Sequence, residues 1–134
     1  MDNPGGQTLP RDMINPPGLP ALNSTYSQAV RANSFVFVAG QIGNVPGTTR
    51  LVNDDIVDQA RQALDNVATI LEAAGSSLSK VVSVSLFLTQ FDQLSRVNEV
   101  YSKYFPQDGP AKFACGVTAI YGGAKLEIQV IALA

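Results

Sequence analysis

Positions 81 to 89 read Val81-Val82-Ser83-Val84-Ser85-Leu86-Phe87-Leu88-Thr89, a stretch that separates two segments with helical periodicity. Successive side chains of a strand point to opposite faces, so the expected apolar face is Val82, Val84, Leu86 and Leu88. The other face carries Ser83, Ser85 and Phe87 and is half polar. The stretch therefore predicts a strand in a sheet with one fully covered face.

The segment before this strand predicts an amphipathic helix. Asn53 or Asp54 is expected to cap the helix, and Gly75 is suited to the position just after its end. Its apolar residues recur at helical spacing: Ile56, Ala60, Ala63, Leu64, Val67, Ile70, Leu71 and Ala74. We expect this apolar side to cover the sheet.

The segment after the strand predicts a second, shorter helix. Asp92 is the expected N-cap, and the buried stripe is Leu94, Val97, Tyr101 and Phe105. Asn98 lies beside that stripe. Its position is more typical of a polar residue at the edge of a packed face than of a residue that contacts a ligand.

Two pairs of strands complete the pattern. Residues 26–31 and 35–42 are expected to form a hairpin, and residues 112–120 and 125–133 another through Tyr121-Gly122-Gly123. Gly40, inside the second strand, indicates either a bulge or the close approach of a ligand to bare backbone. The order β-β-α-β-α-β-β predicts a single α+β domain, a mixed sheet with two helices packed on one face.

Residues 1–20 are rich in Pro and Gly and predict an extended or disordered, flexible N-terminal arm ahead of a domain at 21–134. An arm that closes over a neighbouring subunit is the alternative. The length of 134 residues fits one domain.

Composition excludes several classes of function. The net charge is −2 and no run of Lys or Arg occurs, which argues against a nucleic-acid partner. No apolar run is long enough to span a membrane, and a single cysteine is compatible with a reducing, cytoplasmic location. Only 15% of residues are charged, which favours self-association.

Histidine is absent, so Ser-His-Asp and Cys-His catalysis are excluded within the chain, and no metal site is expected. Glu127 lies between Leu126 and Ile128 in a strand and must face solvent, meet a cation or have a raised pKa suited to proton transfer. Lys112 begins the preceding strand, and by itself a surface lysine is the simpler interpretation.

Two further side chains are candidates for a functional site. Cys115 is interpreted as a small buried residue, because no histidine activates it. Tyr26 is suited either to capping a pocket or to packing in the core.

The sequence resembles the RidA/YjgF family of reactive-intermediate (enamine/imine) deaminases from about Leu19 to the C-terminus. The segments that carry the resemblance are 26–30, 36–42, 59–66, 71–78, 97–101 and 126–128. The resemblance implies a chorismate-mutase-like fold that assembles as a homotrimer around a central barrel, with ligand clefts between subunits. It implies no cofactor.

The resemblance also implies residue roles. Lys112 is placed where these deaminases carry the arginine of a Pro-Ala-Arg motif that binds the substrate carboxylate. Glu127 matches the acidic residue associated with the hydrolytic water. Ala114 matches a position whose backbone contacts the substrate. Many members have a cysteine at that position, whereas the cysteine of this chain, Cys115, is one residue later. The other matching cleft positions are Tyr26, Gly40 and Asn98.

Three functions are therefore expected as alternatives. The first is hydrolytic deamination of a small carboxylated enamine or imine to a 2-oxo acid and ammonia. The second is a pathway-specific deaminase, hydrolase or isomerase acting on an aminomuconate-like acid. The third is a non-catalytic ligand-binding trimer, because lysine lacks the planar two-donor geometry of arginine.

Overall fold

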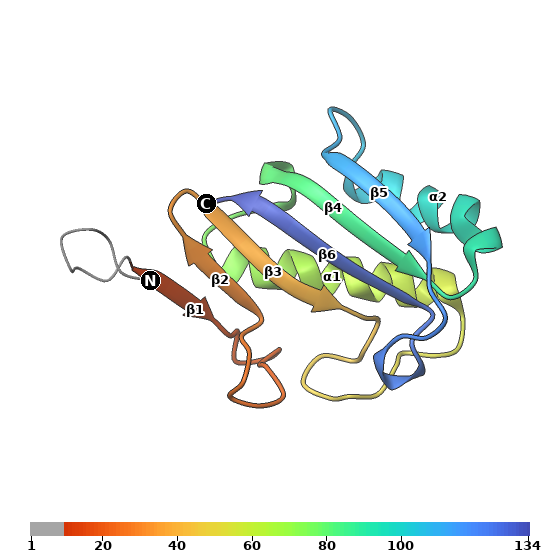
Figure 1. The fold of residues 1–134 in the computed structure, drawn as a ribbon, viewed down its shortest axis with the longest axis horizontal. Helices are drawn as coiled ribbons and strands as arrows, with labels where there is room; N and C mark the ends of the chain where they lie inside the picture. Colours follow the sequence, from red (N-terminus) through yellow and green to blue (C-terminus); the bar gives the residue numbers. More distant parts are fainter. Residues whose placement is uncertain (1–9) are drawn as a thin grey trace.

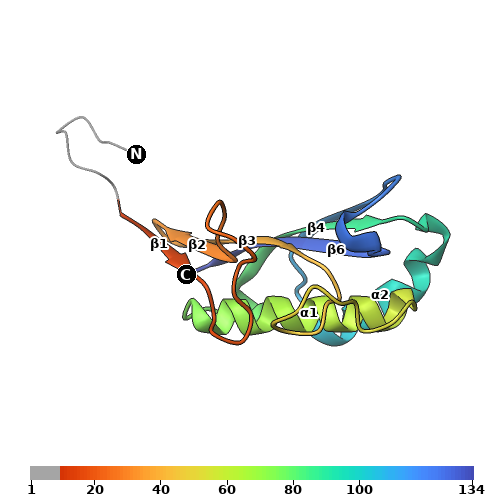
Figure 2. The same cartoon turned by 90° about the horizontal axis from the view of Figure 1, so that it is seen from below.

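The computed structural model describes residues 10–134 as one six-stranded mixed sheet with two α-helices on one side (Figures 1 and 2). The strands are β1 (Arg11–Ile14), β2 (Ala29–Ala32), β3 (Phe35–Gln41), β4 (Val81–Leu88), β5 (Ala111–Gly116) and β6 (Leu126–Leu133). The helices are α1 (Ile56–Ala73) and α2 (Leu94–Tyr104), and three 3₁₀ turns are η1 (Leu78–Lys80), η2 (Phe91–Gln93) and η3 (Tyr121–Gly123). The α+β class and the placement of both helices on one face are confirmed.

The strand order is β1-β2-β3-β6-β4-β5, and within residues 10–134 the pair β4–β5 alone is parallel. The expected hairpin between β5 and β6 is wrong, because β4 lies between them. Burial explains this order. Leu126, Ile128, Val130 and Ala132 of β6 are all buried, whereas no residue of β5 is fully buried. The more apolar strand occupies the centre of the sheet and the more polar one its edge.

The N-terminal segment contains a strand that the sequence analysis did not expect. Residues 11–14 form the edge strand β1, paired antiparallel with β2, and Leu19 is buried in the core. The expectation of a flexible arm is therefore wrong for this part of residues 1–20. The remainder of that expectation, at residues 1–9, lies outside the described residues.

The helix ends differ in detail from the sequence expectations. Asp55, not Asn53 or Asp54, is the N-cap of α1, and its carboxylate accepts a hydrogen bond of 3.1 Å from the backbone N–H of Asp58. Asp92 lies within η2 and does not cap α2. Gly75 adopts the expected positive φ of 79° just after α1.

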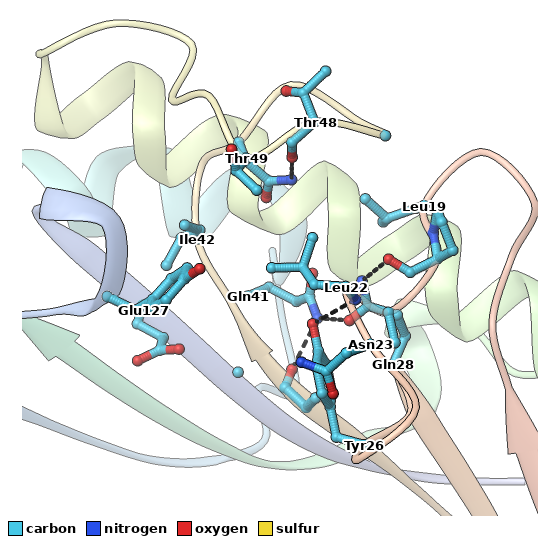
Figure 3. Close-up of a pocket in the computed structure, with 17 residues that line it drawn as sticks. Leu19, Leu22, Asn23, Tyr26, Gln28, Gln41, Ile42, Thr48, Thr49 and Glu127 are labelled. Atoms are coloured by element: carbon cyan, nitrogen blue, oxygen red, sulfur yellow. Dashed lines mark hydrogen bonds between the residues drawn. The ribbon is translucent and has the colours of Figure 1, made fainter.

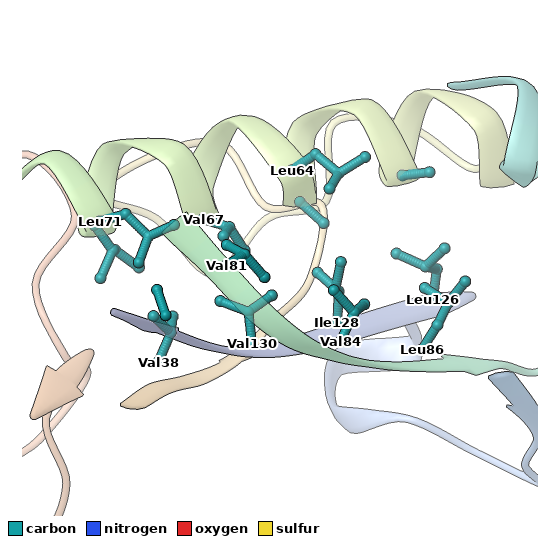
Figure 4. Packing of buried hydrophobic residues seen from close by; sticks show 14 of the residues in the cluster. Val38, Leu64, Val67, Leu71, Val81, Val84, Leu86, Leu126, Ile128 and Val130 are labelled. Atoms are coloured by element: carbon teal, nitrogen blue, oxygen red, sulfur yellow. The ribbon is translucent and has the colours of Figure 1, made fainter. Parts of the chain in front are cut away.

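The core lies between α1 and the sheet, as Figure 4 shows. Buried side chains of α1, among them Leu64, Val67 and Leu71, pack on alternate residues of β3, β6 and β4. Val82 was expected on this face but is 38% exposed, because the pairing register of β4 shifts between Val81 and Ser83.

The opposite face of the sheet carries exposed apolar side chains. Phe35 and Phe37 of β3, Phe113 of β5 and Leu133 of β6 are each at least 39% exposed. We call this surface the open face. Within residues 10–134, no helix is both long and apolar enough to cross a membrane.

Candidate functional site

A pocket of about 550 Å³ lies where β3 ends and β6 begins (Figure 3). Its walls come from the segment before β2, the loop between β3 and α1, and the η3 turn. The apolar lining includes Leu19, Leu22 and Ile42, and the polar lining includes Asn23, Tyr26, Gln28, Asn44, Thr48, Thr49, Tyr121 and Glu127. A mainly apolar hollow with a few convergent polar groups is typical of small-molecule sites.

Glu127 lies directly over the bare backbone of Gly40. A Cβ added at Gly40 would be 2.5 Å from Glu127 Oε2 and 2.9 Å from its Cδ, so any larger residue would have to displace the Glu127 side chain. The pairing of β3 with β6 also shifts register between Val38 and Gln41, around this residue. The bulge expected at Gly40 is therefore confirmed. The group close to its backbone is a side chain of the same chain, and the approach of a ligand stays a prediction.

The Glu127 carboxylate is half-buried and accepts no hydrogen bond and forms no ion pair within residues 10–134. Burial raises the pKa of this carboxyl above its usual value, because the charged form loses solvation without gaining a partner. A carboxylate with these properties is suited to accepting a proton from a bound water.

Tyr26 faces the same pocket. Its hydroxyl accepts a hydrogen bond of 3.0 Å from the backbone N–H of Leu22, and the residue as a whole is 40% exposed. Behind it, the buried Gln41 donates to Gln28 Oε1 at 2.9 Å, and Gln28 donates to the carbonyl of Pro20 at 3.2 Å. These bonds connect the segment before β2, which contains Tyr26, to β3. Tyr26 therefore lies at the rim of the pocket, which agrees with the pocket-capping interpretation of this residue.

Two buried amides on α1 hold the other wall of the pocket. Asn66 donates to the carbonyls of Ile42 and Asn44, each at 3.2 Å. Gln59 donates to the carbonyl of Asn53 and accepts from the backbone N–H of Lys125, each at 2.8 Å. Neither amide is among the candidate site residues expected from the sequence. The sequence pattern that could have revealed Gln59 and Asn66 is a pair of polar residues, seven positions apart, on an otherwise apolar helix face.

A second group of the expected residues surrounds Lys112. Its ammonium donates a hydrogen bond of 2.6 Å to Asn98 Oδ1 and lies 4.1 Å from the centre of the Tyr101 ring. Burial of the ammonium lowers the pKa of Lys112. Ala114 lies on the same side of β5 and packs against the core. Lys112 is exposed, as the surface-lysine interpretation expects, and its ammonium nevertheless has a fixed hydrogen-bond partner in Asn98.

The two groups lie on opposite faces of the sheet. Lys112 is in register with Val84, whose side chain is buried under the helices, whereas Glu127 is in register with Phe87 on the open face. Cys115 is also in register with Phe87 and therefore lies on the open face, away from Lys112. One chain brings Tyr26, Gly40 and Glu127 together, and separately Lys112, Asn98 and Ala114.

Within the described part of the chain, no three His, Cys, Asp or Glu side chains are grouped to hold a metal ion. The chemistry that the arrangement can support is proton transfer by Glu127 and anion binding by Lys112.

The chain is similar to known proteins in both sequence and structure. The family model described as endoribonuclease L-PSP matches residues 19–134, and a solved structure of the Rid protein family, YyfA of Yersinia pestis, superimposes with a TM-score of 0.89. The chain belongs to the RidA/YjgF family. The YyfA structure is 36% identical, and the match covers 93% of this chain and all of that one.

Two curated relatives in the RidA/YjgF family show how similar the sequences are. A RutC family protein of Pyrococcus horikoshii is 44% identical over 107 residues, 80% of this chain and 85% of its own length. The goat protein named 2-iminobutanoate/2-iminopropanoate deaminase is 37% identical over 126 residues, 94% of this chain and 92% of its own. The family and fold that the sequence resemblance implied are therefore confirmed.

Proposed function

We propose that this protein hydrolyses small carboxylated enamines or imines to 2-oxo acids and ammonia. The observation that carries the proposal is Glu127, a half-buried carboxylate without a partner in the described chain, held over Gly40 in a pocket. Relatives named imine deaminases, at 37% identity over nearly the whole chain, support this reaction class.

We propose further that the active unit is a homotrimer with its clefts between subunits. Because Lys112 and Glu127 lie on opposite faces of one sheet, a substrate cannot contact both in a single chain. A cleft in which the Lys112 group of one subunit meets the Glu127 pocket of the next contains both. The exposed Phe37 and Phe113 of the open face supply apolar area for such packing.

The proposed chemistry needs one water molecule and no cofactor. Lys112 binds the substrate carboxylate, and Glu127 removes a proton from water as its oxygen attacks the imine carbon. Glu127 passes this proton to the imine nitrogen, which gives a neutral carbinolamine. Glu127 then takes the proton of the carbinolamine hydroxyl and delivers it to the nitrogen, so that the C=O bond forms as the C–N bond breaks and ammonia leaves. The backbones of Gly40 and Ala114 border the nitrogen end of the substrate. The sum is imino acid plus water giving 2-oxo acid plus ammonia.

Lysine at position 112 is the principal departure from the family pattern. A guanidinium donates two parallel hydrogen bonds to a carboxylate, whereas an ammonium is a point charge. The loss of one such bond costs about 1–3 kcal/mol, roughly ten- to a hundredfold in affinity. This residue is the observation that favours the two alternatives, a pathway-specific enzyme for an aminomuconate-like acid or a binding protein without catalysis.

Ribonuclease activity, which the description of the family model names, is not proposed. A chain with net charge −2 and no histidine has neither a basic surface for RNA nor the commonest general base.

The deciding experiment measures ammonia release from freshly generated 2-iminobutyrate or 2-aminoacrylate. We expect acceleration by the wild type, loss of turnover in Lys112→Ala, and preserved or increased turnover in Lys112→Arg. No acceleration by the purified wild type would contradict the deaminase proposal. Equal affinity for a carboxylate ligand in wild type and Glu127→Gln, with no turnover in either, would favour the binding protein.

A further inference from the structure

We propose that Lys112 and Asn98 together form a two-donor carboxylate site and that Tyr101 is the residue that positions it. The inference rests on the proposed function for the identity of the ligand, a carboxylate. The inference is argued from the contacts of the Lys112 ammonium. Lys112, Asn98 and Tyr101 together supply two fixed hydrogen-bond donors, which an arginine side chain supplies by itself.

The contact with Lys112 fixes the orientation of the Asn98 amide. An ammonium can only donate hydrogen bonds, so the Asn98 atom 2.6 Å from Nζ is the carbonyl oxygen. The amide nitrogen is then the other end of the group, and within residues 10–134 it donates to no acceptor. Lys112 has two further N–H groups. Two neighbouring nitrogen atoms, one from each residue, can therefore donate to the two oxygens of one carboxylate.

Tyr101 supplies the surface on which the ammonium rests. Nζ lies 4.1 Å from the ring centre, within the range of a cation–π contact, and the other ring contact is with Phe105, centre to centre 4.7 Å. The Tyr101 hydroxyl is buried and has no hydrogen-bond partner in the described chain. The ring, and not the hydroxyl, is therefore the part of Tyr101 that acts on Lys112.

The fold explains why these three residues meet and why a ligand can reach them. Asn98 and Tyr101 are three residues apart on α2 and so point the same way. They face Lys112 on β5, which in the described part of the chain pairs with β4 alone and is an edge of the sheet. A long, flexible lysine side chain is held in one place by contacts from a separate helix, which reduces the conformational entropy that binding would otherwise cost.

The first test is a double-mutant cycle that measures binding and not turnover. The probe is 2-oxobutanoate, a stable carboxylate, titrated by calorimetry into wild type, Asn98→Leu, Lys112→Arg and the double variant. We expect Asn98→Leu to weaken binding about tenfold in the wild-type background but less than about threefold with arginine at 112, because the guanidinium has both donors itself. Equal losses in the two backgrounds would overturn the two-donor site.

The second test separates the ring of Tyr101 from its hydroxyl. Tyr101→Phe keeps the ring and removes an unsatisfied buried group, so affinity for 2-oxobutanoate should stay within about twofold of wild type. Tyr101→Leu keeps apolar volume but removes the π face, so we expect about a fivefold loss. Unchanged affinity in Tyr101→Leu, with a native thermal transition, would overturn the positioning role.

The pH dependence of binding gives a readout that a purely structural role would not move. Affinity should fall at alkaline pH as Lys112 loses its proton, and Tyr101→Leu should move this fall to lower pH, because the ring stabilises the charged form. Tyr101 is the titratable group that faces Lys112 from α2, and Val84 is its neighbour on β4. A fall at the same pH in Tyr101→Leu and wild type would contradict the inference.

The two proposals fail separately. Absence of imine hydrolysis by the wild type, with the expected coupling between positions 98 and 112 in binding, would contradict the deaminase function and leave the carboxylate site supported. Normal imine hydrolysis, with no coupling between positions 98 and 112 in binding, would support the deaminase function and contradict the two-donor carboxylate site.

Discussion

Lys112 and Glu127 project from opposite faces of the sheet, although only strand β4 separates the strands that carry them. Lys112 is exposed on the face that carries the helices, where Asn98 of α2 accepts its hydrogen bond, and Glu127 points to the pocket above Gly40. The proposed reaction uses both side chains on one small substrate, so we expect it to need two copies of the chain.

Mixing two inactive variants should restore activity. In trimers that contain both Lys112→Ala and Glu127→Gln subunits, some clefts combine the intact Glu127 of one subunit with the intact Lys112 of the other. After unfolding and refolding a 1:1 mixture, roughly a quarter of clefts should be native if subunits assort at random. Ammonia release from 2-iminobutyrate measures the recovery.

The control for this experiment is a mixture of Lys112→Ala with the Lys112→Ala/Glu127→Gln double variant, which contains no intact cleft. Recovery in the control equal to that in the test mixture, or none in either, would contradict a cleft formed between subunits.

The open face should hold the trimer together. Phe37 is 44% exposed on this face, so Phe37→Asp would place a charge inside the proposed interface. We expect this variant to sediment as a monomer and to lose deaminase activity. Ser95→Asp, which adds the same charge at an exposed position on α2, should remain a trimer. Wild type that sediments as a monomer would remove the basis for the shared cleft.

Gly40→Ala should damage the site without unfolding the protein. The new methyl group would lie 2.5 Å from Glu127 Oε2 and must push the carboxylate aside. A displacement of about 1 Å in a catalytic group can cost about a hundredfold in rate, so kcat should fall far more than stability. The matched control is Gly18→Ala, where a Cβ meets nothing within 4 Å. A Gly40→Ala enzyme with wild-type kcat would show that the carboxylate position is not critical.

Glu127→Gln should stabilise the protein at neutral pH while it removes turnover. Burial raises the pKa of Glu127 in the folded state, so the unfolded chain releases this proton more easily than the folded chain does. The destabilising effect is present above the folded-state pKa and disappears as pH falls below the unfolded value near 4.5. The gain from Gln should be at most about 1 kcal/mol, because the group is half solvated.

Chemical denaturation of wild type and Glu127→Gln at pH 7 and at pH 4 measures this difference. A gain that is larger at pH 4 than at pH 7 would have the wrong sign and would contradict a desolvated carboxylate.

Asn66→Ala should loosen the pocket wall. The substitution leaves the carbonyls of Ile42 and Asn44 without the amide that now donates to them, at a cost of about 1–3 kcal/mol. We expect faster hydrogen exchange in the loop between β3 and α1 and a higher KM. Gln62→Ala, which removes only the donor to Asn66 Oδ1, is the matched control and should have a smaller effect. Equal exchange in the two variants would show that Asn66 does not hold this loop.

Several features of this protein could be predicted from local sequence because they depend on local chemistry. The period of 3.6 in residues 56–74 is enough to predict α1, and a glycine suited to positive φ is enough to predict its end at Gly75. Glu127 could be singled out because a carboxylate between Leu126 and Ile128 in a strand carries a solvation cost wherever the strand lies. The family resemblance then singled out Lys112 as the residue expected to bind the substrate carboxylate.

Other features required the tertiary structure because they depend on which strands become neighbours. A strand's sequence shows which side chains share a face but not which strand it pairs with, so β6 was expected beside β5 instead of between β3 and β4. The same pairing places Lys112 and Glu127 on opposite faces and brings Asn98 and Tyr101 to Lys112. Local residue types determined which groups can bind an anion or move a proton. Long-range strand pairing, which is decided by the burial of β6, determined that one chain holds them apart.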